Sequence, residues 1–170
     1  MRSQVTVGLL WALLAVDQAG ATCLADHTGF FTGRLRGALE LDLEWRGEAL
    51  DCETTLRPDG QGLRFRFTAA LAGGGELTLV LAPPEVPAEP TSQPIPFNLT
   101  VMEEPGGRIF GTRGTGQCLL ELRTSAGTAG PFEAMGYCIG PARSLTDGQP
   151  LLLTTFDFRA PPPAKLDSAP

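Results

Sequence analysis

The sequence contains almost none of the histidine on which many catalytic and metal sites depend. His27 is the only histidine in 170 residues, and this excludes a metal site built from several histidines. A Ser-His-acid triad would need Ser92, Ser125 or Ser144 beside His27, and none of these serines lies in a Gly-x-Ser-x-Gly elbow. We therefore interpret His27 as a surface residue of an N-terminal loop.

Lysine is equally scarce, since Lys165 is the only lysine among 13 basic residues. The 19 acidic residues give the chain a net charge of −6. An acidic chain without a basic cluster is a poor candidate for binding nucleic acid or an anionic membrane surface. Asparagine and isoleucine are rare as well. Because the codons of these three residues are rich in A and T, their scarcity indicates a GC-rich genome, most simply that of a bacterium with a periplasm.

The chain also lacks an apolar run long enough to span a bilayer, which takes about 20 residues. Its longest run, Val5 to Val16, has twelve residues and follows the positive charge of Arg2. Ala19 and Ala21 then supply the small residues of a cleavage site. This layout predicts a removable signal peptide over residues 1–21, and therefore a periplasmic or secreted protein with no membrane span.

Four cysteines follow the predicted signal peptide: Cys23, Cys52, Cys118 and Cys138. They form no Cys-x-x-Cys or zinc-binding spacing, so in an oxidising compartment we expect two disulfides. The flanking segments are symmetric about Thr128, which places Cys118 opposite Cys138 in a hairpin; Cys23–Cys52 follows by elimination. The alternative is a lipoprotein acylated on Cys23. Thr22 stands where a lipobox has Gly or Ala, and acylation would leave an odd number of cysteines.

Apolar and polar residues alternate along most of the remaining chain, and no helical stripe interrupts them. About nine segments read as strands: 39–45, 50–56, 63–67, 76–81, 97–104, 108–112, 118–124, 132–138 and 151–158. This pattern predicts an all-β fold, an antiparallel β-sandwich or closed barrel of about nine strands stapled by the two disulfides. We expect one β domain over residues 22–159, with a Pro-rich loop at 83–96 and a disordered tail at 160–170.

Short links with turn residues join the first four strands, which predicts an antiparallel meander. A turn centred on Gly47–Glu48 pairs strand 39–45 with strand 50–56, and the next turn pairs 50–56 with 63–67. Both registers place apolar residues opposite apolar residues, as the buried face of a sheet requires.

This register gathers charged side chains on the outer face of the meander. Glu44 faces Asp51, and Asp42 faces Glu53, although like charges directly opposed destabilise a sheet. Arg66 lies opposite Glu53, and Arg64 lies opposite Thr55. The candidate binding residues of this acidic face are Glu40, Asp42, Glu44, Asp51, Glu53, Arg64 and Arg66.

Four interpretations of the acidic face remain open. The first is a solvated surface balanced by its two arginines, and the second is a docking patch for a cationic partner. The third is a Ca²⁺ site, because Ca²⁺ prefers oxygen ligands. The fourth is a carboxylate pair for glycoside hydrolysis. Catalytic residues, another metal and an organic cofactor are not predicted.

The function that we predict is that of a non-catalytic binding or envelope-accessory protein. Its partner would be an unknown protein or glycan of the cell envelope. The alternative is a small secreted hydrolase that uses surface carboxylates or His27. A concave site with perturbed carboxyl pKa values would favour the enzyme, whereas a flat or grooved patch would favour the binding protein.

Overall fold

The computed structural model describes residues 23–57, 62–87, 93–112, 114, 116–123 and 130–163. These residues form a single antiparallel sheet of 11 strands with one short 3-10 helix, η1 (Gly47–Ala49). The strands are β1 (Phe30–Gly37), β2 (Leu41–Arg46), β3 (Asp51–Leu56), β4 (Leu63–Ala70), β5 (Glu76–Ala82), β6 (Ile95–Glu104), β7 (Arg108–Gly111), β8 (Cys118–Leu122), β9 (Phe132–Cys138), β10 (Ala142–Ser144) and β11 (Pro150–Ala160). The predicted all-β antiparallel fold is confirmed.

The strand order along the sheet is β2-β1-β11-β10-β7-β6-β5-β4-β3, while β8 pairs with β6 and β9, and β9 pairs with β11. Successive strands from β3 to β9 therefore lie next to their neighbours in sequence, apart from the step between β7 and β8. Both β7 and β8 pair with β6, and both β9 and β10 pair with β11. Each couple thus acts as one long strand with an irregular break.

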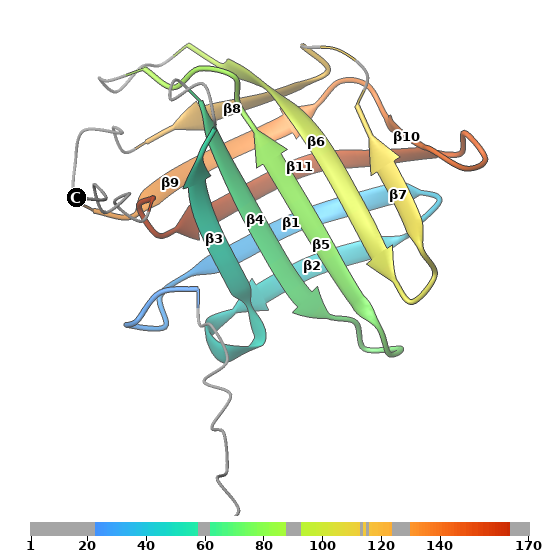
Figure 1. Cartoon of the computed structure of the whole chain (residues 1–170), viewed down its shortest axis with the longest axis horizontal. Helices are drawn as coiled ribbons and strands as arrows, with labels where there is room; N and C mark the ends of the chain where they lie inside the picture. The colour runs from blue at the N-terminus through green and yellow to red at the C-terminus, as the bar shows by residue number, and fades with distance from the viewer. Residues whose placement is uncertain are drawn as a thin grey trace, which may run out of the picture.

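The sheet folds over on itself into two layers, whose strands cross steeply (Figure 1). Strands β2, β1, β11 and β9 lie in one layer, and β3, β4, β5 and β6 lie in the other. Their buried faces meet in one core with a phenylalanine cluster at its centre: Phe31, Phe65, Phe67, Phe156 and Phe158. Ring centroids in this cluster approach to 4.9 Å, a spacing at which each aromatic pair adds about 0.5–1.5 kcal/mol beyond its buried area.

Strand β1 was missed by the prediction because a glycine interrupts its alternation. Phe31 and Leu35 are both fully buried, and Gly33 occupies the inward position between them. A Cβ at Gly33 would lie 3.1 Å from the Phe31 ring and 3.3 Å from Leu153, so the close approach of β11 explains the glycine. Strand β10 was also missed, because three residues are too few to show a period.

The predicted pairing of segments 39–45 and 50–56 is wrong. Strand β2 pairs with β1, and β3 pairs only with β4 among the described residues. The link through η1 is a corner that carries the chain from one layer to the other. The apolar stripes of β2 and β3 thus face each other across the core instead of lying side by side. The predicted pairing of 50–56 with 63–67 is confirmed, including Glu53 opposite Arg66 and Thr55 opposite Arg64.

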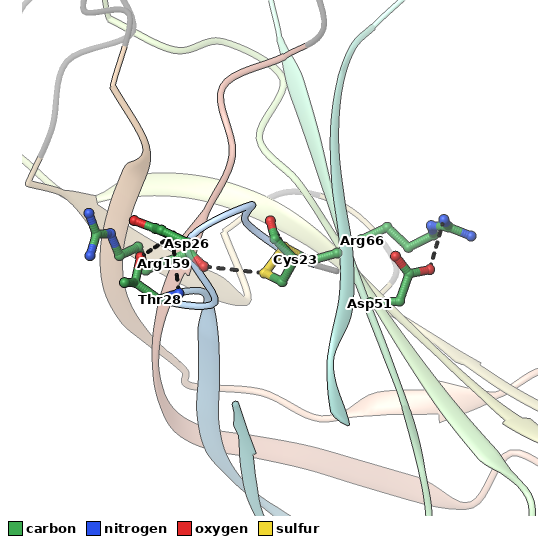
Figure 2. The surroundings of a disulfide bond; sticks show 7 residues. Cys23, Asp26, Thr28, Asp51, Arg66 and Arg159 are labelled. Carbon is green, nitrogen blue, oxygen red and sulfur yellow. Dashed lines mark hydrogen bonds and ion pairs between the residues drawn. A yellow bond between two sulfur atoms is a disulfide. The ribbon is translucent and has the colours of Figure 1, made fainter. Parts of the chain in front are cut away.

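Both predicted disulfides are confirmed. Cys118 and Cys138 are directly opposite each other in the β8–β9 ladder, as the symmetry about Thr128 predicted. The Cys23–Cys52 bond fixes the start of the described chain to β3, and the Cys23 amide donates to the Leu50 carbonyl at 3.2 Å. Figure 2 shows this disulfide beside the end of β11, where the Cys23 Sγ lies 3.6 Å from the Arg159 carbonyl oxygen. Two disulfides indicate an oxidising, extracytoplasmic compartment.

Two strands extend beyond the predicted limits of the domain and of its Pro-rich loop. Strand β6 begins at Ile95, inside the predicted Pro-rich loop of 83–96, and β11 continues to Ala160. The predicted signal peptide, 1–21, and residues 164–170 of the predicted tail lie outside the described residues. Within the described chain, no helix is long and apolar enough to cross a membrane.

Candidate functional site

The seven candidate residues of the predicted acidic face fall into two groups on different layers. Glu40, Asp42 and Glu44 lie beside or on β2, where Glu44 pairs with Thr32 and Asp42 with Arg34. The other group lies on β3 and β4: Asp51, Glu53, Arg64 and Arg66. The four opposed carboxylates on which the acidic face depended are therefore not brought together.

The β3–β4 group balances its own charge, because it contains two carboxylates and two arginines. Arg66 Nη2 lies 3.4 Å from Asp51 Oδ2 and 3.2 Å from Glu53 Oε2, with all three side chains between one third and just over half exposed. Figure 2 shows Arg66 turned towards Asp51 along the outside of these strands. Exposed pairs of this kind contribute at most about 1 kcal/mol each. This group is a solvated, self-compensated surface.

The β2 group borders a groove of about 510 Å³ on the outer face of the other layer. Residues of β1, β2, β9 and β11 line it: Thr32, Gly33, Arg34, Asp42, Leu43, Glu44, Met135, Thr155, Phe156 and Asp157. We call this the outer groove. The side chains of Leu43 and Phe156 are buried in the core, so their backbone, with that of Gly33, forms the floor.

A single row of side chains crosses the outer groove from strand to strand. Glu44 is opposite Thr32, Thr32 is opposite Asp157, and Asp157 is opposite Met135. Neighbouring strands are about 4.8 Å apart, so the backbones of Glu44 and Asp157 are about 10 Å from each other, with Thr32 between them. The groove therefore presents a carboxylate on each side of a hydroxyl.

A bulge in β11 shapes the middle of the groove. The register between β1 and β11 shifts between Gly33 and Leu35, where two residues of β11, Thr154 and Thr155, stand against Arg34 alone. A bulge bends its strand and turns consecutive side chains to the same face. Thr154 and Thr155 accordingly both avoid the core, while Leu153 and Phe156 on either side are buried.

The carboxylates of the groove differ in how far protein cations satisfy them. Asp42 Oδ1 is bound by Arg36 Nη2 at 2.6 Å and lies 3.9 Å from Arg34 Nε. Asp157 Oδ2 lies 3.6 Å from Arg123 Nη1, whereas the buried Asp157 Oδ1 has no hydrogen-bond donor among the described residues.

Glu44 is exposed and makes no ion pair within the described chain. A further cation in the groove would therefore meet Glu44 without a competing partner, and it would meet Asp157 through Oδ2, which it would share with Arg123.

Among the described residues, two carboxyl groups have a clearly displaced pKa, and both lie outside the groove with the pKa displaced downwards. The Thr28 hydroxyl and amide hold the pKa of Asp26 below 3.8, its usual value. The Ser144 hydroxyl and the Gln149 amide do the same to the pKa of Asp147. Carboxyls with lowered pKa values stay ionised at neutral pH and are poor general acids.

The hydroxyl and imidazole candidates are also apart from the groove. His27 is exposed in the turn before β1, as predicted, and has a left-handed backbone with φ of 56°. Ser144 is buried, and its Oγ accepts the amides of Thr146 and Asp147 in the turn before β11. Ser92 and Ser125 lie outside the described residues.

No cluster of three or more His, Cys, Asp or Glu residues able to hold a metal occurs in the described ranges. The described acidic residues are divided between two layers, so the opposed carboxylates behind the Ca²⁺ interpretation, one of the four left open, do not occur together.

Sequence reasoning identified Asp42 and Glu44 but missed Thr32, Thr155 and Asp157. Asp157 lies at an outward position of the predicted last strand, so its exposure could be read from the alternation. The strands that lie next to Asp157 could not be read from the sequence, because the strand between β11 and β2 is β1, which the alternation did not reveal. Comparison with family models, with curated proteins and with solved structures finds no match.

Proposed function

We propose that this chain is a non-catalytic binding protein of an oxidising, extracytoplasmic compartment, and that the outer groove binds a cationic group of its partner. One observation carries the proposal. Two carboxylates that the described protein leaves wholly or partly unsatisfied, Glu44 and Asp157, flank Thr32 in a groove large enough for a side chain. A guanidinium above Thr32 could donate to Glu44 and to Oδ2 of Asp157, because its forked nitrogens span more distance than a compact ammonium does.

The apolar contacts of the groove suit the same class of ligand. Met135 is 41% exposed at the end of the row, next to Asp157. A long basic side chain has an apolar stem and a charged head, so it can contact a thioether while its head reaches a carboxylate.

The test uses small probes that differ only in charge. Nα-acetylated argininamide, called argininamide below, should shift the backbone amide NMR signals of Thr32, Glu44 and Asp157 in a ¹⁵N-labelled protein, whereas its neutral isostere Nα-acetylcitrullinamide should not. Each exposed ion pair is worth about 0.2–1 kcal/mol, so Glu44→Gln and Asp157→Asn should each weaken argininamide binding by roughly 1.4-fold to 5-fold.

Glu76→Gln is the matched control, because Glu76 is an exposed carboxylate of β5 in the other layer. This variant changes the net charge by the same amount and should bind argininamide like the parent. Equal weakening by all three variants would show only a long-range effect of net charge. That result, or the absence of any shift in the groove, would refute the proposed function.

A further inference from the structure

Strand β2 is an end strand of the sheet. It pairs with β1 on one side, and no described residue pairs with it on the other. An end strand presents a row of unpaired amides and carbonyls that can template another strand. The other end strand, β3, is partly covered, because Cys23 donates its amide to Leu50 and is bonded to Cys52.

The register identifies which groups of β2 face this free edge. The Gly47 amide donates to Gly29 in the same alignment that pairs Trp45 with Phe31 and Leu43 with Gly33. In an antiparallel ladder the hydrogen-bonded pairs alternate with non-bonded ones. The amides and carbonyls of Trp45 and Leu43 therefore point to β1.

It follows that the amides and carbonyls of Asp42, Glu44 and Arg46 point to the free edge. Their side chains are exposed on the outer face, in contrast to the buried Leu43 and Trp45 between them. The edge thus offers backbone donors and acceptors at the same residues that offer charge, two of them carboxylates of the outer groove.

We propose that the free edge of β2 binds an extended segment of a partner protein as an added strand, with basic side chains at alternate positions opposite Asp42 and Glu44. This inference rests on the proposed function and specifies its ligand. Side chains directly opposite each other on one face of a sheet have Cβ atoms about 4.5–5.5 Å apart. A partner arginine opposite Glu44 could therefore reach that carboxylate and extend along the row towards Thr32.

Glu44 disfavours a second copy of this chain as the occupant. Of the two symmetric antiparallel registers with the longest overlap, one places Asp42 opposite Glu44 and Glu40 opposite Arg46, and the other places Glu44 opposite Glu44 and Asp42 opposite Arg46. In both registers Glu44 faces a carboxylate, although Arg46 gains an acidic neighbour. Opposed like charges destabilise a sheet. A partner with basic residues at alternate positions makes the corresponding contacts favourable.

The experiment measures binding of synthetic seven-residue peptides to the full mature chain by titration calorimetry and by amide NMR. The lead peptide carries arginines at two alternate positions among threonine and valine. One comparison peptide has the two arginines adjacent, a second has citrulline in their place, and a third is N-methylated on the amides that would face β2. The lead peptide should bind and should protect the Asp42 and Glu44 amides from hydrogen exchange.

Loss of the edge hydrogen bonds should weaken the N-methylated peptide at least tenfold, because each net hydrogen bond contributes about 0.5–1.5 kcal/mol. Glu44→Gln should weaken the lead peptide, whereas Glu53→Gln on the other end strand should not. Equal binding of the lead and N-methylated peptides would overturn strand addition. Self-association of the free protein that protects the β2 amides would overturn the choice of partner.

The two proposals fail in distinguishable ways. If argininamide occupies the outer groove but no peptide protects the β2 amides, strand addition is wrong and the proposed function stands. If neither argininamide nor the lead peptide binds, both are wrong.

Discussion

Replacing Gly136, the only glycine of β9, with alanine is expected to destabilise the fold strongly. Gly136 lies in the ladder opposite Leu120 on one side and Phe156 on the other. A Cβ there would lie 2.5 Å from Phe156 Cζ and 2.9 Å from Phe156 Cε1, and closer still to the Leu119 carbonyl oxygen. The phenylalanine ring could shift at a cost to the central cluster, but the carbonyl belongs to the β8 backbone and cannot rotate away.

Overpacking a core by a methyl group costs about 1–3 kcal/mol, and a clash with fixed backbone places Gly136→Ala at the upper end, near 3 kcal/mol. With a urea m-value of about 2 kcal/mol/M for a domain of this size, the unfolding midpoint should fall by about 1.5 M. Urea titration followed by far-UV circular dichroism measures this shift directly.

Gly111→Ala is the matched control for Gly136→Ala. Gly111 is also a strand residue, the last one of β7, but a Cβ there meets no heavy atom within 4 Å. Its midpoint should change little or rise slightly, because alanine has less conformational freedom to lose in a strand. If both variants unfold at the same urea concentration, the packing of Phe156 on Gly136, and with it the floor of the outer groove, is wrong.

Two further predictions concern the disulfides and the response to acid. Cys118→Ser with Cys138→Ser should lower the free energy of unfolding by roughly 3 kcal/mol, and Cys23→Ser with Cys52→Ser by roughly 3–4 kcal/mol, because the bonds close loops of 20 and 29 residues. Equal urea midpoints before and after removal would contradict this.

The pKa values of Asp26 and Asp147 are lowered in the folded state, so their contribution to stability is present above about pH 3.8 and is lost as the pH falls through the folded values. Asp26→Asn with Asp147→Asn should flatten the fall of the melting temperature below pH 4, and an unchanged slope would refute this assignment.

Much of the architecture is determined by the sequence itself because it depends on local rules. Alternation with a period of two assigns each residue of a strand to the inner or outer face, and it does so correctly for Leu43, Trp45, Phe65 and Phe67. A short link fixes the register of the strands that it joins, which is why the β3–β4 pairing could be predicted. The same symmetry about a turn predicted the Cys118–Cys138 bond, and parity of the cysteines then left only Cys23–Cys52.

The neighbours of β2 and the existence of the outer groove were decided only by the tertiary structure. The Gly47–Ala49 link resembles a hairpin turn in sequence, yet the chain there crosses between layers. Strand β1 instead lies between β2 and β11, and it pairs Phe30 with Arg159, which is far away in the sequence. Alternation states which face a side chain occupies, but it carries no information about which distant strand lies next to it. Contacts such as that of Thr32 with Asp157 depend on how two apolar faces close over one core, and that closure is a property of the whole sheet.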